Sequence, residues 1–173
     1  MNRIRSVLVW ISRLRYSRGF GIQSPSDYWF VCHVINEHWP YYQYAELGAD
    51  DSWLRRKMGL LCFRLANWRQ PRVISSDDYT DYLHAGCHKA VFGKGNELLV
   101  VRLDSSKWET QLDNLLTEVD ENSVVVIDGI WRNKSAWHKV VTDERSVITF
   151  DLYYCGIVLF NPARTKKNYI INF

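Results

Sequence analysis

Two short, wholly apolar runs constrain the fold of this chain most strongly. Residues 98–101 read Leu-Leu-Val-Val, and residues 124–127 read Val-Val-Val-Ile. Strands that are apolar on both faces belong inside a parallel sheet that helices cover on both sides. Residues 79–90 and 108–119 carry apolar side chains at three- and four-residue steps, as amphipathic helices do. This alternation predicts an α/β fold of three layers with right-handed crossovers.

The end of the chain follows a different pattern. Residues 147–150, 157–160 and 169–173 are apolar segments joined only by loops. Parallel neighbours need a crossover of about a dozen residues or more, whereas antiparallel strands can be joined by short turns. We therefore predict a mostly parallel sheet with an antiparallel C-terminal end.

The first part of the chain is predicted to be helical. Ser24 and Ser52 are suited to cap two helices, and the second helix stops before Pro71. Residues 1–70 thus form extra N-terminal helices, and residues 71–173 form the sheet. A length of 173 residues is typical of one domain, so we expect residues 1–173 to fold as a single unit.

Residues 1–16 form an amphipathic pattern of their own. The chain has five arginines before its first acidic residue, Asp27. The apolar stripe of this segment consists of Ile4, Val7, Leu8, Ile11 and Leu14. A basic amphipathic helix can lie on a membrane, but Arg15 falls back onto the stripe. We favour a helix docked on its own domain over contact with a membrane surface.

Charge and cysteine spacing narrow the class of protein. The formal net charge of +3 is too small to indicate a nucleic-acid partner. The four cysteines form no Cys-x-x-Cys pair, which excludes zinc-ribbon and thioredoxin-type sites. The apolar run at residues 7–11 is far shorter than the ~20 residues that cross a bilayer. It also lacks the cleavage site of a secretory signal, and we expect a cytoplasmic protein.

Several segments resemble one family. Residues 18–25, Arg-Gly-Phe-Gly-Ile-Gln-Ser-Pro, are similar to the Arg-Gly-His-Gly-Ile-His-Ser-Pro segment of a bacterial family of class I S-adenosylmethionine-dependent methyltransferases. Residues 61–68 resemble the family helix that leads into the first strand. Residues 123–131 and 147–160 resemble its last three strands. The resemblance implies a Rossmann-like sandwich.

The resemblance breaks after residues 73–74, which match the first strand of the family. There the family has an acidic, glycine-rich loop and two further strand–helix units, whereas this chain continues Ser-Ser-Asp-Asp-Tyr and has no glycine until Gly86. The resemblance implies that the missing part supplies the second and third strands and the acidic residue that holds the cofactor ribose. Glycines let a backbone approach a cofactor closely. We therefore predict a reduced sheet that keeps family strands one, four, five, seven and six and has lost one edge.

The candidate pocket lies where the predicted parallel strands end, since open sheets bind ligands outside the carboxyl ends of their strands. The residues expected there are Ser75, Ser76, Asp77, Asp104 and Asp128. Two carboxylates can act as a base or hold Mg²⁺. The resembled family has a further carboxylate where this chain has Gly129, so no third metal ligand is evident.

Two other groups of residues are weaker candidates. His84 and His88 are four residues apart on a predicted helix and can in principle share a metal. With no third ligand assignable, we interpret them as a surface pair and expect no metal. Tyr41, Tyr42 and Tyr44 lie in an aromatic loop that we take as an interface candidate for a protein partner or a second copy of the chain.

Two functions follow from the resemblance and its gap. The first is a methyltransferase-like protein that has lost S-adenosylmethionine binding, needs no cofactor and acts as a binding or scaffold module. The alternative is an active minimal O-methyltransferase whose atypical pocket still takes S-adenosylmethionine. The missing glycine loop favours the first, because small-ligand sites enclose most of their ligand in a preformed cleft.

Overall fold

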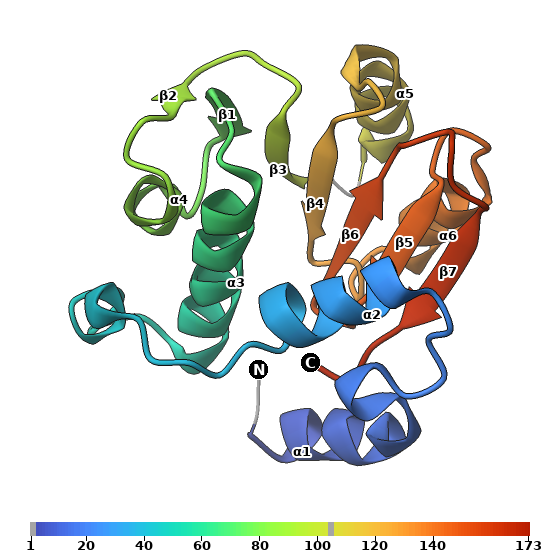
Figure 1. Ribbon diagram of the computed structural model, residues 1–173. Helices are drawn as coiled ribbons and strands as arrows, with labels where there is room; N and C mark the ends of the chain where they lie inside the picture. Colours follow the sequence, from blue (N-terminus) through green and yellow to red (C-terminus); the bar gives the residue numbers. More distant parts are fainter. Residues whose placement is uncertain (1–2, 104–105) are drawn as a thin grey trace.

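The computed structural model describes residues 3–103 and 106–173, and its strands form one seven-stranded mixed sheet in the order β2-β1-β3-β4-β6-β5-β7 (Figure 1). The strands are β1 (Val73–Ser76), β2 (Val91–Phe92), β3 (Leu98–Arg102), β4 (Val124–Asp128), β5 (Ile148–Asp151), β6 (Cys155–Leu159) and β7 (Lys167–Ile170). The two apolar runs thus become β3 and β4, which are parallel central neighbours, as predicted.

The strand directions confirm a mixed sheet. β1 is parallel to β2 and β3, and β3 is parallel to β4, whereas β6 is antiparallel to both β4 and β5. The last three strands alternate in direction as predicted, since β6 runs opposite to β5 and β7 runs opposite to β6. The neighbour of β7 was not predicted: it pairs in parallel with β5. β7 passes over β5 to reach the sheet edge. A short connection then suffices, since the strand still runs opposite to β6, the strand that precedes it.

The prediction of a reduced sheet was wrong, since the sheet has seven strands. The order β1-β3-β4-β6-β5 is the one expected. The two additions lie at the edges: β7 extends the C-terminal edge, and β2 pairs with β1 at the edge where strands were expected to be missing. β2 is only two residues long, so this edge is closed by a short segment.

Helices cover both faces of the sheet (Figure 1). The α-helices are α1 (Arg3–Ser12), α2 (Pro25–Phe30), α3 (Trp53–Arg69), α4 (Thr80–Gly86), α5 (Trp108–Glu118) and α6 (Lys134–Thr142). The shorter helical segments are the 3-10 turns η1 (Leu14–Gly19) and η3 (Tyr42–Ala45) and the π-helical turn η2 (Val31–Ile35). In β4, Val124 and Val126 pack on the side of α2, α3 and α4, whereas Val125 and Ile127 pack on the side of α5 and α6.

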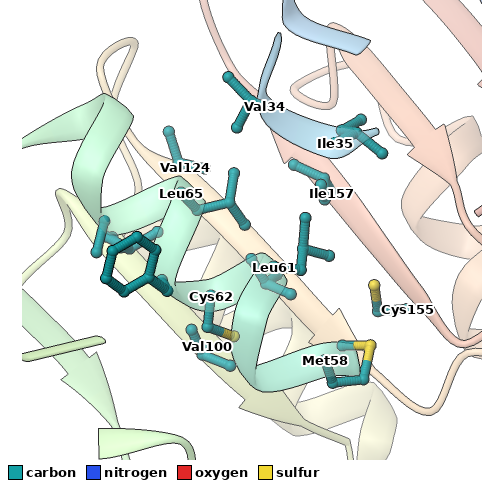
Figure 2. Packing of buried hydrophobic residues seen from close by; sticks show 14 of the residues in the cluster. Val34, Ile35, Met58, Leu61, Cys62, Leu65, Val100, Val124, Cys155 and Ile157 are labelled. Carbon is teal, nitrogen blue, oxygen red and sulfur yellow. The ribbon is translucent and has the colours of Figure 1, made fainter. Parts of the chain in front are cut away.

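The longest helix, α3, forms the centre of the larger core (Figure 2). Its Met58, Leu61 and Leu65 are fully buried and face strand residues such as Ile157. Ser52 caps α3 as predicted, accepting a hydrogen bond from the Arg55 backbone N–H at 3.3 Å. Burial of each large apolar side chain contributes about 1.5–3 kcal/mol, so this stripe fixes α3 on the sheet.

α4 is shorter than the predicted helix over residues 79–90. It ends at Gly86, and Cys87 and Ala90 follow outside it. Gly86 packs so closely on α3 that a Cβ at this position would collide with the Phe63 carbonyl oxygen. The glycine that interrupts the sequence pattern is therefore the contact that lets α4 lie against α3.

The edge formed by β1 and β2 is covered unequally. Ile74 is fully buried on the α3 side, but Val73 and Ser75 on the other side are only half-buried, and Val91 of β2 is 66% exposed. The loop before β3 reaches this second side, where Gly95 lies against Val73. A groove therefore remains between β1 and α5.

α1 forms where a helix was predicted, but its apolar stripe is not docked on the protein. Val7, Leu8, Trp10 and Ile11 of α1 and Leu14 of η1 are 47–61% exposed. The prediction of a helix that buries this stripe on its own domain was wrong. Among the described residues, no helix is both long and apolar enough to cross a membrane.

Candidate functional site at the strand ends

A cavity lies at the carboxyl ends of β1, β3 and β4, where the candidate pocket was expected. It is an open cavity of about 550 Å³ between these strand ends and α5. Four of the five predicted residues line it: Ser75, Ser76, Asp77 and Asp128. The fifth, Asp104, lies outside the described residues. The volume is within the range of small-ligand sites, so the chemistry of the lining decides what the cavity can take.

The turn after β1 is held by its own side chains. Ser76 Oγ donates to the Asp78 carbonyl oxygen at 2.6 Å and accepts from the Asp78 N–H at 3.2 Å. The Tyr79 N–H donates to Asp78 Oδ1 at 2.9 Å. These backbone N–H groups already have partners within the turn. They are the kind of donor that a phosphate- or ribose-binding loop offers to its ligand.

Tyr79 occupies the one left-handed position of this turn, with φ at 58°. Glycine adopts such a conformation without steric cost, whereas a bulky residue adopts it only when its surroundings compensate. The Tyr79 ring is 5% exposed, and its hydroxyl donates to Asp128 Oδ2 at 3.3 Å. An aromatic ring thus fills the space beside the β4 end that a glycine would leave open.

Arg102 joins the two acidic ends of the crevice. The register of β3 and β4 sets it directly opposite Asp128. Its guanidinium donates to Asp128 Oδ2 through both Nε, at 3.1 Å, and Nη2, and it contacts Asp78 Oδ2 at 3.4 Å. Arg55 of α3 approaches Asp78 from the other side at 2.8 Å. Asp78 and Asp128 are therefore neutralised by arginines of the same chain.

The electrostatics agree with this geometry. The hydrogen bond from Arg102 to Asp128 raises the pKa of the Arg102 guanidinium, and the hydrogen bond to Asp78 raises that of Arg55. Burial, followed by the charge of Asp128, raises the pKa of the Tyr79 hydroxyl. All three groups stay protonated at neutral pH, so the network is fixed as donors facing carboxylates.

This arrangement limits the chemistry of the two predicted functions of Asp128. A general base must accept a proton, but Asp128 Oδ2 already accepts from Arg102 and Tyr79. A cation would have to displace the Arg102 guanidinium. Within residues 3–103 and 106–173, no three His, Cys, Asp or Glu side chains come together as a metal site.

His84 and His88 contact each other, and no third metal ligand joins them within the described residues. The rings of His84 and His88 lie with centroids 5.1 Å apart, and Gln43 Nε2 is 3.1 Å from His88 Nε2. α4 ends between the two histidines, so the predicted single helix does not carry both of them. Their contact is with each other and with a glutamine amide.

The fit of S-adenosylmethionine to this crevice is poor by the same observations. A cofactor sulfonium and ribose need a close backbone and free acceptors, as the glycine loops of nucleotide-binding folds provide. Here the left-handed position carries the buried Tyr79, and both acceptor carboxylates, Asp78 and Asp128, are bound to arginines.

The tyrosine loop presents less surface than predicted. Tyr42 is fully exposed, but the rings of Tyr41 and Tyr44 pack on Phe63 with centroids 5.1 and 5.2 Å away. Burial, followed by the hydrogen bond to Glu37, raises the pKa of Tyr41 to about 12. Two of the three interface candidates thus anchor the loop to α3, and only Tyr42 offers its ring to a partner.

Sequence reasoning missed three residues that shape these regions. Arg64 is buried in α3 and donates to the carbonyl oxygens of Val34 at 2.7 Å and Ile35 at 2.9 Å, which ends η2. Arg102 and Tyr79 line the crevice and bond to Asp128. Arg102 directly follows an apolar strand, as Asp128 does in β4, and this shared position was the available signal for the pair.

Comparisons of the chain with protein-family models, curated proteins and solved structures found no match.

Proposed function

We propose that this chain is a binding or scaffold module on a methyltransferase-like, Rossmann-like fold that does not hold S-adenosylmethionine at its strand ends. The observation that carries the proposal is the closed ion network at those ends. Arg102 bridges Asp78 and Asp128, and Tyr79 fills the adjoining space. The fold is kept, while the polar groups that would recognise the cofactor are used within the chain.

A cofactor that binds these carboxylates has to displace an existing ion pair. For the cofactor to bind these carboxylates, Arg102 has to leave Asp128, whose side chain is only 12% exposed. Because the Arg102 side chain is 56% exposed, this ion pair contributes only about 1 kcal/mol, and a ligand must replace that interaction before it gains any affinity. A site selected to hold the cofactor would present these acceptors free.

The active minimal methyltransferase is the second candidate. The 550 Å³ cavity and its lining by Ser75, Ser76 and Asp77 favour it. In that case the turn after β1 opens on binding and Arg102 moves aside. The two candidates differ in one measurable property, which is affinity for the cofactor and its demethylated product.

Thermal unfolding with S-adenosylmethionine and S-adenosylhomocysteine separates the two candidates. A ligand that binds the folded chain at about 100 times its Kd adds about 2.7 kcal/mol, which shifts Tm by roughly 5–10 °C at this size. We expect no shift with either compound, and no heat in calorimetric titration. A shift of that size would replace the proposal by the active candidate.

If binding is found, the Asp128→Asn variant decides its location. If the ligand binds in the strand-end cavity, its Tm shift should vanish in this variant while the fold is kept, because asparagine conserves the shape of the side chain and removes its charge. A matched control is Asp113→Asn, since Asp113 is an exposed residue of α5 outside the cavity lining.

A further inference from the structure

We propose that the outward face of α1 is a docking surface for an anionic lipid membrane. We call this face the α1 apolar face and define it by Val7, Leu8, Trp10, Ile11 and Leu14. The five side chains are 47–61% exposed. Monomeric soluble proteins rarely leave large apolar side chains contiguous and exposed unless the patch binds something.

The orientation of the helix makes this face outward. Ser6, Val9, Arg13 and Tyr16 follow one another at steps of three and four residues, and all four are only partly exposed. This stripe therefore faces the protein, and the α1 apolar face lies on the other side. A surface helix of a globular protein ordinarily shows the reverse arrangement, with its apolar stripe inward.

A specific anchor holds α1 in this orientation. The Arg13 guanidinium donates to the carbonyl oxygen of Asp151 at 3.0 Å and to its carboxylate at 2.8 Å, and it also reaches the Ile171 carbonyl oxygen at 3.3 Å. Asn172 adds a hydrogen bond to the Trp10 carbonyl oxygen at 3.3 Å. Polar contacts thus attach the helix near its C-terminal end, and the side chains of the α1 apolar face take no part in them.

Figure 1 places α1 at one end of the molecule, next to the C-terminus and away from the faces of the sheet. The anchor of α1 is Asp151 at the carboxyl end of β5, whereas the crevice lies at the carboxyl ends of β1, β3 and β4. The crevice at the strand ends and the α1 apolar face are separate parts of the surface, so neither proposal depends on the other.

The positive charge of the N-terminal segment favours an anionic lipid surface as the partner. Five arginines and no acidic residue precede Asp27 in the sequence. Arg13 among them is paired with Asp151, whereas Arg15 is exposed beside the α1 apolar face. Anionic lipids attract such a segment by about 1 kcal/mol for each basic residue near the surface, and half-buried apolar side chains add their own transfer energy. A second copy of the chain is disfavoured, because a symmetric contact would bring the two arginine-rich segments together.

The test is flotation of the full chain with vesicles. We expect about ten-fold more protein on phosphatidylcholine vesicles that contain roughly 30% phosphatidylglycerol than on pure phosphatidylcholine, since tenfold corresponds to only 1.4 kcal/mol. Salt at about 0.5 M should reduce this difference, because it screens the arginines. The Leu8→Ser/Ile11→Ser variant should lose most of the binding while its thermal unfolding is unchanged.

Val91→Ser is the matched control, because Val91 is an exposed apolar residue of β2 at the far edge of the sheet (Figure 1). It should float like the wild type. Equal flotation of wild type and the Leu8→Ser/Ile11→Ser variant overturns the proposal, as does equal binding to neutral and anionic vesicles. A concentration-dependent dimer that the same variant abolishes also overturns it, in favour of a second copy.

Discussion

The strand-end crevice and the α1 apolar face differ in how their side chains are compensated. In the crevice, the charges of Asp78 and Asp128 are matched by Arg55 and Arg102 of the same chain. On α1, five large apolar side chains have about half of their surface exposed. The crevice is where a fold of this kind ordinarily binds ligands. The exposed apolar side chains lie elsewhere, on the α1 apolar face. A partner gains more free energy by covering that face than by displacing the arginines that already pair with Asp78 and Asp128.

Replacing Tyr79 tests how much its buried ring supports the crevice, and it has the largest expected effect. Tyr79→Ala should lower the free energy of unfolding by about 3 kcal/mol, since a buried aromatic ring is lost. Tyr79→Phe should cost about 1 kcal/mol or less, because it removes only the 3.3 Å hydrogen bond to Asp128. Urea unfolding measures both. A near-neutral Tyr79→Ala variant would mean that the ring does not support the crevice.

Lys57 of α3 is a partly buried cation near the α1 end. It lines a cavity with Trp10 and Phe173, and burial, followed by the nearby positive charge of Arg64, lowers its pKa from 10.5 to about 8. The unfolded chain binds this proton more tightly than the folded one between pH 8 and pH 10.5, so the stability of the wild type rises with pH across that window.

Lys57→Met should therefore stabilise the protein most below pH 8. We expect about 2 kcal/mol at neutral pH, since one pKa unit corresponds to about 1.4 kcal/mol and the rings of Trp53 and Phe173 already favour the ammonium. The advantage over the wild type should fall steadily as the pH rises towards 10. Urea unfolding at pH 7 and at higher pH measures it, and a pH-independent difference would contradict the assignment.

Arg102 sharpens the comparison with a smaller effect. Its side chain is 56% exposed, so Arg102→Met should cost only about 1 kcal/mol although it leaves Asp128 without a charged donor. Arg102→Lys keeps the charge but loses the forked geometry, and it should recover part of that stability. Neither variant should create affinity for S-adenosylhomocysteine. Tight binding by Arg102→Met would indicate a latent cofactor site beneath the arginine.

The smallest expected effect belongs to the α1 apolar face. Leu8→Ser/Ile11→Ser should change the free energy of unfolding by less than about 0.5 kcal/mol, because the side chains are largely exposed. In contrast, Leu61→Ala in α3 should cost about 3 kcal/mol. Chemical unfolding of the two variants compares an outward and an inward stripe directly. A large loss in the α1 variant would show that its stripe supports the fold.

The sequence predicted the centre of the fold because hydrophobic periodicity is local. The runs that became β3 and β4 are apolar at every position, and α3 has a cap residue and a proline to delimit it. The edges were not fully predicted. β2 has two residues and no pattern of its own, and β7 pairs with β5 instead of with β6, the strand that precedes it.

The orientation of α1 and the state of the candidate site depend on long-range contacts. The apolar stripe on α1 can be recognised in the sequence. Its outward orientation goes with the contact between Arg13 and Asp151, which are 138 residues apart in the sequence. Likewise, Ser75, Ser76, Asp77 and Asp128 line the predicted cavity, yet the opposition of Arg102 and Asp128 follows from strand register. A periodic pattern identifies a helix face without showing what covers it.

Hydrogen–deuterium exchange on the full chain, with S-adenosylhomocysteine and with anionic vesicles in separate samples, tests the contrast between the two regions most directly. We expect the nucleoside to leave exchange at residues 75–79 and 98–102 unchanged, and vesicles to slow exchange across residues 3–14. Slower exchange at the strand ends with the nucleoside, together with no change in α1 on vesicles, would contradict this expectation.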